Sequence, residues 1–141
     1  MKIRKGSDRD AASCLKIARL DKAKHWEIQD FKNSAIDRNA VFFVAENEGN
    51  VIGYILGFVV PTRHSEALIH ETRIHRSFRR KGIGTALVER FCQHAFKSNV
   101  NTISALIDPK HLKFYSNVCK FKNVGKWIEV SKKRSVSLRK K

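Results

Sequence analysis

The stretch that decides the fold is Arg-Arg-Lys-Gly-Ile-Gly at residues 79–84. It lies between a strand-like run at residues 68–74 and a run of helical pattern at residues 85–96. The two glycines let the backbone turn tightly without a Cβ in the way, so successive N–H groups can point toward an anion at the positive end of the following helix. Three neighbouring cations add attraction. The stretch therefore predicts a phosphate-binding loop between a strand and a helix.

Two other kinds of phosphate loop use similar glycines, and neither fits this chain. A dinucleotide fingerprint requires Gly-x-Gly-x-x-Gly, but Leu87 stands at the third glycine position after Gly82 and Gly84. A P-loop requires Gly-x-x-x-x-Gly-Lys-Ser/Thr, and the sequence contains no such string. We therefore expect the loop to bind a phosphate-bearing ligand of another kind.

Length and composition indicate one soluble domain. The chain has 141 residues, enough for a real hydrophobic core, and we expect residues 1–141 to form a single domain. No apolar run reaches the length of a membrane helix, and the first residues lack the apolar segment of a signal peptide. Three cysteines without metal-binding spacing are typical of a reduced, cytoplasmic protein. We therefore expect a cytoplasmic protein without a membrane partner.

The net charge is the unusual property of the composition. Twenty-nine Lys and Arg against 13 Asp and Glu give a formal charge of +16. Such a charge favours polyanionic partners. A phosphorylated cofactor needs only a few of these cations, so the surplus predicts an anionic or nucleic-acid-associated partner as well.

Hydrophobic periodicity predicts alternating strands and helices along the whole chain. A capping-box pattern at residues 7–10 precedes an apolar helical face that begins at Ala11, and a four-residue turn at 47–50 separates two strands. Expected helices cover residues 11–18, 30–36, 85–96 and 111–118. Expected strands cover residues 1–5, 41–46, 51–60, 68–74, 102–107, 121–124, 126–130 and 134–139.

This order of elements, together with the glycine loop, resembles the GNAT family (GCN5-related N-acetyltransferases) over almost the whole chain. The resemblance implies an α/β fold: a single domain with a mixed, mostly antiparallel sheet flanked by helices. In that family the fourth and fifth strands splay apart and leave a slot for the pantetheine arm of coenzyme A. Acetyl-CoA is then the expected cosubstrate.

The resemblance also implies which residues hold the cosubstrate. The end of the fourth strand would lend backbone groups to pantetheine, and the glycine loop would hold the pyrophosphate. Asp108 stands where the family usually has Asn, and a carboxylate there would be repelled by phosphates. The expected cofactor-binding residues are Thr72, Arg73, Ile74, His75, Arg79, Arg80, Lys81, Gly82, Ile83, Gly84, Thr85 and Asp108.

A second matching segment, Leu-Lys-Phe-Tyr at residues 112–115, resembles the Phe-Tyr pair of the family, whose tyrosine commonly protonates the departing thiolate. A phenol of pKa about 10 can donate to a sulfur anion of pKa about 8.5 when it lies within hydrogen-bond reach. Tyr115 is therefore the expected general acid, with a packing role as the alternative. Where the family usually has Gly-Phe after this helix, the chain has Cys-Lys-Phe at 119–121; we expect Cys119 to be a packing residue.

A protonated amine cannot attack, so a base is needed, and His70 and Glu71 on the strand before the loop are the candidates. Neighbours on a strand point to opposite faces, so only one would face the slot unless a bulge changes the alternation. Histidine titrates near neutral pH, which favours His70, while water or Glu71 stays open. The remaining histidines show no metal-binding spacing, so no metal site is predicted.

The sequence thus predicts an acetyl-CoA-dependent N-acetyltransferase in which a primary amine attacks the thioester directly in a ternary complex. The alternative is a nucleic-acid-binding protein with a catalytically weak or inactive GNAT-like domain, which the +16 charge supports. No RNA-binding or helix-turn-helix motif accompanies that charge. The acceptor and the oligomeric state, a homodimer included, are left open.

Overall fold

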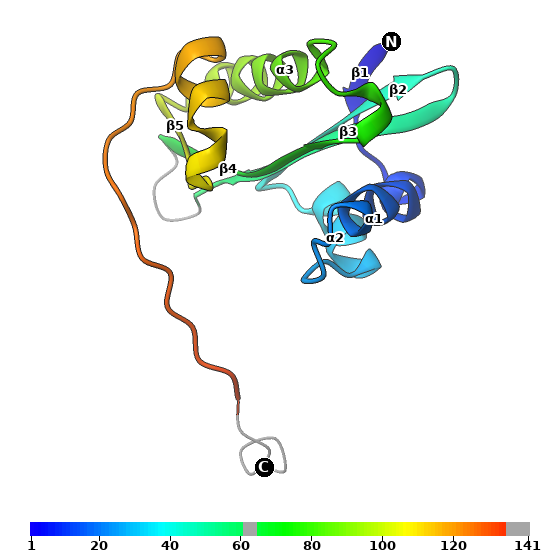
Figure 1. The fold of residues 1–141 in the computed structure, drawn as a ribbon, viewed down its shortest axis with the longest axis horizontal. Coiled ribbons are helices and arrows are strands. Elements are labelled where there is room, and N and C mark those ends of the chain that lie inside the picture. The colour runs from blue at the N-terminus through cyan, green and yellow to red at the C-terminus, as the bar shows by residue number, and fades with distance from the viewer. Residues whose placement is uncertain (61–64, 135–141) are drawn as a thin grey trace.

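The computed structural model describes residues 1–60 and 65–134, and Figure 1 shows their arrangement. The strands are β1 (Lys2–Lys5), β2 (Ala40–Asn47), β3 (Asn50–Val59), β4 (Glu66–Ile74) and β5 (Thr102–Ala105). The α-helices are α1 (Ala11–Leu20), α2 (Ile28–Ile36) and α3 (Ile83–Lys97). Short 3₁₀ turns cover Asp8–Asp10, Arg76–Phe78 and Pro109–His111, and a π-helical turn covers Phe114–Val118.

The strands form one sheet in the order β1-β2-β3-β4-β5, antiparallel except for the parallel pair β4 and β5. Helices α1 and α2 cover one face of this sheet and α3 covers the other (Figure 1). The expected mixed, mostly antiparallel sheet flanked by helices is therefore confirmed.

The inner strand β2 shows why the sheet is covered on both faces. Its residues from Val41 to Ala45 are all buried. Val41, Phe43 and Ala45 join the core beneath α3, while Phe42 and Val44 join the core beneath α1 and α2. Since alternate side chains of a strand point to opposite faces, an uninterrupted apolar run fits only a strand that is buried on both sides.

The apolar stripe that predicts the third helix is also the face that this helix buries. Ile83, Leu87, Phe91 and Ala95 recur every four residues and are buried in the core beneath α3. The helix begins two residues earlier than expected, at Ile83, directly after Gly82. The glycine loop is therefore joined to the helix without an intervening turn.

The expected strands at 121–124 and 126–130 are wrong, because these residues are irregular and join no sheet in the structure. Residues 122–134, here called the C-terminal arm, run away from the domain (Figure 1). Their alternating pattern was a property of the local sequence, whereas a strand also needs a partner strand. Of the strand expected at 134–139, all but Arg134 lies outside the described residues.

Candidate active site

The fourth and fifth strands pair over a short distance and then part. Their register runs from Glu66 opposite Thr102 to Ile69 opposite Ala105. β4 continues to Ile74, and among the described residues no β5 partner faces that second half. Past Ile69, the backbone from Thr72 to His75 has no β5 partner among the described residues, so a thin linear ligand could hydrogen-bond there as a further strand would. Three expected cofactor-binding residues, Thr72, Arg73 and Ile74, lie in this part of β4, and His75 follows it directly.

A β-bulge at His70 decides which way the two candidate bases point. Leu56 of β3 pairs with Glu71, and the next residue, Gly57, pairs with Ile69, so His70 has no partner in the register. The His70 ring lies 5.1 Å from the Trp26 ring, on the α1 and α2 side of the sheet. The extra residue shifts the alternation of side chains by one position, so the neighbours His70 and Glu71 face the same side of the sheet.

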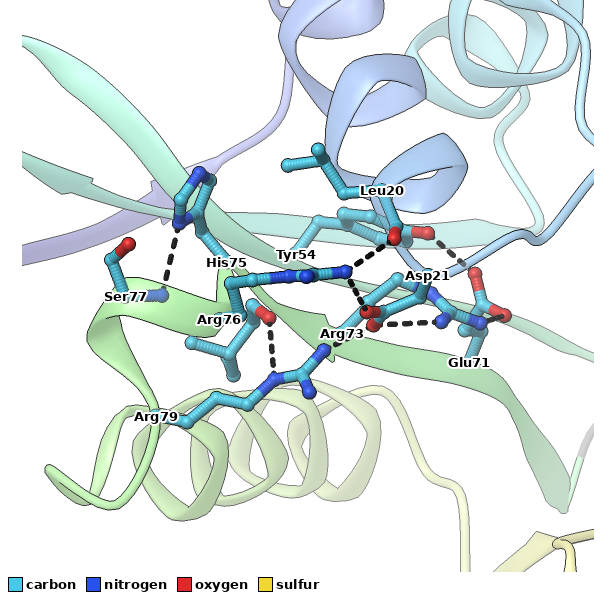
Figure 2. A network of polar contacts seen from close by, with 10 residues as sticks. Leu20, Asp21, Tyr54, Glu71, Arg73, His75, Arg76, Ser77 and Arg79 are labelled. Carbon is cyan, nitrogen blue, oxygen red and sulfur yellow. Dashed lines mark hydrogen bonds and ion pairs between the residues drawn. The ribbon is translucent and has the colours of Figure 1, made fainter.

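Glu71 is the centre of a polar network beneath α1, shown in Figure 2. The Tyr54 hydroxyl donates to Glu71 Oε2 over 2.5 Å, and the Arg73 guanidinium donates to Glu71 Oε1 over 2.6 Å. Burial and the adjacent Glu71 carboxylate raise the pKa of Tyr54. Burial alone would lower the pKa of Arg73, but hydrogen bonding to Glu71 raises it overall. Both carboxylate oxygens of Glu71 are therefore engaged, which suits a positioning role better than proton transfer.

The network extends to Asp21, at the end of α1 (Figure 2). Arg73 donates to Asp21 Oδ2 over 3.0 Å, and Arg79 pairs with the same carboxylate. Arg79 Nε also donates to the Ile74 carbonyl over 3.0 Å, and Arg76 donates to the Leu20 carbonyl over 2.6 Å. The Arg79 side chain is thus turned toward α1, and its contact with pyrophosphate stays a prediction.

The glycine loop itself has the geometry of an anion site. Gly82 adopts φ 79° and ψ 7°, a left-handed conformation, and caps α3, while Arg80 also has a positive φ of 63°. The first N–H groups of a helix have no carbonyl partner within the helix, so they are available to an anion. Arg80 and Lys81 are exposed beside them. Ile83 and Thr85 belong to the first turn of α3.

Tyr115 lies across the slot from β4. Its hydroxyl is 3.2 Å from the Thr72 hydroxyl oxygen, and its side chain is 7% exposed. Burial raises the pKa of the Tyr115 phenol, although the Thr72 hydrogen bond opposes the rise. The phenol therefore stays protonated at neutral pH and retains a proton to donate. The structure brings Tyr115 together with Thr72, and the acid role of Tyr115 stays a prediction.

Gly84 couples the loop to the tyrosine. A Cβ at this position would lie 3.3 Å from the ring of Phe114, the residue before Tyr115. The Tyr115 ring packs edge-on against Phe114 and Phe121, with centroids 5.0 and 5.5 Å away. The small residue lets the helix start and the tyrosine-bearing turn pack closely, so the two halves of the site are fixed relative to each other.

Two other predicted residues take local positions. Asp108 accepts a hydrogen bond from the Lys110 backbone N–H over 3.0 Å and caps the turn at Pro109–His111. Burial raises the pKa of the Cys119 thiol to about 11. A protonated, half-buried thiol is a packing group rather than a nucleophile. In the described part of the chain, no group of three or more His, Cys, Asp or Glu is placed to bind a metal ion.

A hollow of about 380 Å³ opens next to the bulge, on the side away from Tyr115. Trp26 and His70 form part of its wall, and two carboxylates from α2 and the turn after it, Asp30 and Asp37, form another part. The remaining lining comes from Asn33, Ser34, Asn39, Ala40, Leu56, Gly57, Phe58 and Val59. This hollow lies beside the bulged part of β4, on the face that His70 and Glu71 share.

The sequence did not predict that Asp21 and Tyr54 join the network around Glu71 and Arg73, or that Trp26 lines the hollow beside the bulge. The involvement of Tyr54 could have been predicted, since a tyrosine within an apolar strand needs a hydrogen-bond partner for its buried hydroxyl. The sequence gives no sign of the role of Asp21, because its arginine partners, Arg73, Arg76 and Arg79, are more than 50 positions away.

Comparison with known proteins identifies the family. Residues 10–121 match the model of the acetyltransferase (GNAT) family. The chain belongs to this family. An N-alpha-acetyltransferase of Sulfurisphaera tokodaii is 32% identical over 97 residues, which cover 62% of this chain and 58% of the relative. An L-2,4-diaminobutyric acid acetyltransferase of Virgibacillus pantothenticus is 30% identical over 69 residues, covering 49% of this chain and 43% of the relative. This GNAT chain thus spans about half the length of these curated relatives.

Solved structures share the GNAT fold at low identity. An aminoglycoside N-acetyltransferase in complex with CoA superposes with a TM-score of 0.80 at 14% identity, covering 94% of this chain and 95% of that one. A ribosomal-protein-alanine N-acetyltransferase from Brucella melitensis biovar Abortus 2308 gives 0.72 at 18%, covering 95% and 100%. At such identities the likeness concerns the fold. Among residues 1–60 and 65–134, no helix is long and apolar enough to cross a membrane.

Proposed function

We propose that this GNAT protein transfers an acetyl group from acetyl-CoA to a primary amine. The observation that carries the proposal is the Tyr115 phenol, 3.2 Å from Thr72 where β4 and β5 part and close to the start of α3. If Tyr115 is the acid and the start of α3 binds phosphate, this arrangement would suit a thioester of a phosphorylated carrier. The alternative of a nucleic-acid-binding protein with an inactive domain has no such observation in its favour.

Acetyl-CoA binding would use three parts of the chain. Backbone groups of Thr72 to His75 would bind pantetheine along the slot, and residues 79–85 would hold the pyrophosphate. The exposed side chains of Arg80 and Lys81 would add attraction to the phosphates. Asp108, whose carboxylate is occupied by the Lys110 N–H, would contact the ligand least.

The chemical step would be a direct transfer in a ternary complex. The amine nitrogen attacks the thioester carbonyl carbon, a C–N bond forms and the C–S bond breaks. Tyr115 gives its proton to the departing sulfur, and the proton of the amine passes to His70, directly or through water. Glu71, held by Tyr54 and Arg73, would fix the bulge from which His70 projects.

The acceptor would enter through the hollow beside the bulge. Asp30 and Asp37 make its wall locally negative and would attract the ammonium form of an amine. The whole chain at +16 attracts anions instead. A primary amine on an anionic or nucleic-acid-associated molecule would be attracted by both: its amine by the carboxylates of the hollow, and its anionic part by the positive charge of the chain. This is the acceptor class that we propose.

The loop offers a sharp test, because the chain contains a matched control glycine. Gly82 and Gly49 have φ of 79° and 81°, and a Cβ at either meets nothing within 4 Å. Gly82→Asp should abolish acetyl-CoA binding, since a negative charge would enter the phosphate site, whereas Gly49→Asp should bind like the wild type. Calorimetry with acetyl-CoA on variants shown to be folded by circular dichroism measures both. Equal affinity in the two variants would remove the loop from the site.

The acceptor can be found by its product. Incubation with radiolabelled acetyl-CoA and a cell lysate, followed by isolation of the labelled species, should yield acetylated primary amines. The Tyr115→Phe variant serves as the control, because it should bind acetyl-CoA but label little. Equal labelling by wild type and variant would contradict the acid role.

A further inference from the structure

Asp21 places a carboxylate at an unfavourable end of α1. It is the C-cap of that helix, where the last carbonyl groups already give a partial negative charge, so the helix dipole opposes an acidic side chain there. Arginines compensate the charge: Arg73 donates to Oδ2 over 3.0 Å, Arg79 pairs with the same oxygen, and Arg76 Nη2 lies 3.9 Å from Oδ1. The contacts that stabilise this carboxylate therefore come from β4 and the loop that follows it, and not from its own helix.

Arg79 also occupies a backbone group at the open edge of β4. The His75 N–H donates to the Ile52 carbonyl of β3, so the backbone groups of His75 point toward β3. Because successive residues of a strand point their backbone groups to opposite sides, those of Ile74 point the other way, where β4 has no β5 partner among the described residues. Arg79 Nε donates to this Ile74 carbonyl over 3.0 Å. The arginine thus uses the edge that the pantetheine arm of acetyl-CoA would need.

The two contacts of Arg79 engage donors that a phosphate would also use. Arg79 is the first residue of the glycine loop, and its guanidinium is directed toward Asp21 at the end of α1 (Figure 2). A guanidinium binds carboxylate and phosphate with the same planar set of N–H groups, so the two anions compete for it. The Arg79 side chain is 46% exposed, so it can turn without breaking core packing.

Release of Arg79 would not leave the carboxylate of α1 without a partner. Arg73 would keep its contact, because it is itself held by Glu71 over 2.6 Å. Arg76 would stay beside it, because it donates to the Leu20 carbonyl over 2.6 Å. Removing every partner of a largely buried charge is strongly destabilising, whereas removing one of three leaves it compensated. One arginine can therefore leave this network at a small cost.

We propose that Asp21 is a positioning residue that holds Arg79 away from the phosphate site, so that acetyl-CoA binds in competition with the Asp21 contact. On binding, the guanidinium leaves the carboxylate for the pyrophosphate, and the Ile74 carbonyl becomes free for pantetheine. The apparent affinity is reduced according to the fraction of molecules in which the contact is closed. This inference rests on the proposed function of residues 79–85 as the pyrophosphate loop.

The sign of one substitution separates this role from a merely structural one. Asp21→Asn keeps the shape of the side chain but loses the charge that holds Arg79, so acetyl-CoA should bind about 3- to 5-fold more tightly, as expected for the loss of one partly exposed ion pair. A carboxylate that served only to hold α1 against β4 would give weaker or unchanged binding. Asp8→Asn, at an exposed position of the first 3₁₀ turn, makes the same change in net charge and should bind like the wild type. Calorimetry with acetyl-CoA, without an acceptor, measures all three proteins.

A double-mutant cycle assigns the effect to Arg79. In an Arg79→Ala background, Asp21→Asn should leave the affinity for acetyl-CoA unchanged, because the competing contact is already absent. An equal gain in both backgrounds would mean direct repulsion between the carboxylate and the phosphates, and would overturn the proposal. So would an Asp21→Asn protein that is folded and binds no more tightly than the wild type.

A measurement on the wild type needs no Asp21 variant, and so holds even if Asp21→Asn fails to fold. The ¹⁵N NMR signal of Arg79 Nε, assigned by its loss in Arg79→Lys, should shift when acetyl-CoA is added, because the N–H leaves the Ile74 carbonyl. A signal that stays unchanged at saturating acetyl-CoA would overturn this inference and leave the proposed function standing. A wild type without affinity for acetyl-CoA would overturn both.

Discussion

The two tyrosines of the chain lie on opposite faces of the sheet and are bound in opposite ways. Tyr54, beneath α1 and α2, donates over 2.5 Å to a carboxylate that also pairs with an arginine. Tyr115, on the α3 face, has one neutral partner, the Thr72 hydroxyl at 3.2 Å, among aromatic rings. A hydroxyl held by a charge is fixed in place, whereas one with a single neutral partner has its proton available to a new acceptor. The network on the α1 and α2 face thus holds the bulged strand in place, whereas the α3 face presents a hydroxyl that can give up its proton.

The largest effect should follow removal of the less tightly bound hydroxyl. Tyr115→Phe should lower kcat by about 10²- to 10⁴-fold with little change in acetyl-CoA affinity, because only the departing thiolate loses its proton donor. Steady-state kinetics and calorimetry separate the two quantities. Since burial raises the pKa of Tyr115, the alkaline limb of the wild-type kcat profile should lie above the ordinary tyrosine value of about 10. A variant with the wild-type kcat would assign Tyr115 to packing.

A smaller kinetic effect should follow loss of the imidazole at the bulge. His70→Ala should lower kcat/KM about 10- to 100-fold and remove the acidic limb of its pH profile, because the amine would lose its proton acceptor. His25→Ala is the control: His25 stacks on the same Trp26 ring at 5.0 Å but does not line the acceptor hollow. An unaltered acidic limb in His70→Ala would point to Glu71 or water as the base.

Substitution on the α1 and α2 face should lower the stability of the fold. Tyr54→Phe should cost about 1–3 kcal/mol of unfolding free energy, because a hydrogen bond to a charged group is lost and Glu71 is left under-coordinated. Tyr115→Phe, which loses a neutral bond, should cost about 0.5–1.5 kcal/mol. Urea unfolding followed by circular dichroism compares the two. Equal costs for the two substitutions would mean that the faces do not differ in the way described.

The smallest effect concerns the charge of the whole chain. The acceptor kcat/KM should fall several-fold between about 50 mM and about 500 mM salt, because screening weakens the attraction of an anionic carrier to a chain at +16. Spermidine, a free polycation, is the control and should be a poor substrate. Efficient acetylation of spermidine that is insensitive to salt would contradict an anionic acceptor.

Local pattern predicted much of this molecule. The apolar stripe of α3, the strand β2 and the glycine loop are encoded in adjacent residues, so periodicity and turn chemistry predicted them. The acid role of Tyr115 and the parting of the fourth and fifth strands were expected from the resemblance to a family.

What could not be predicted depends on segments far apart. The bulge at His70 is a property of the register between β3 and β4, and either residue of the His-Glu pair had to be left open until that register was known. The pattern of the arm predicted strands because its side chains alternate, but residues 1–60 and 65–134 offer it no partner strand. Asp21 pairs with arginines across a long loop in the sequence, which no local pattern records.

The contact of Asp21 with Arg79 spans 58 positions of the chain, and that of Thr72 with Tyr115 spans 43. Such non-local contacts form late, because the entropy of closing long loops opposes them until the sheet is in place. A chain emerging from the ribosome has α1, α2 and the first four strands before it has Tyr115. The contact of Tyr115 with Thr72 would therefore be among the last to form.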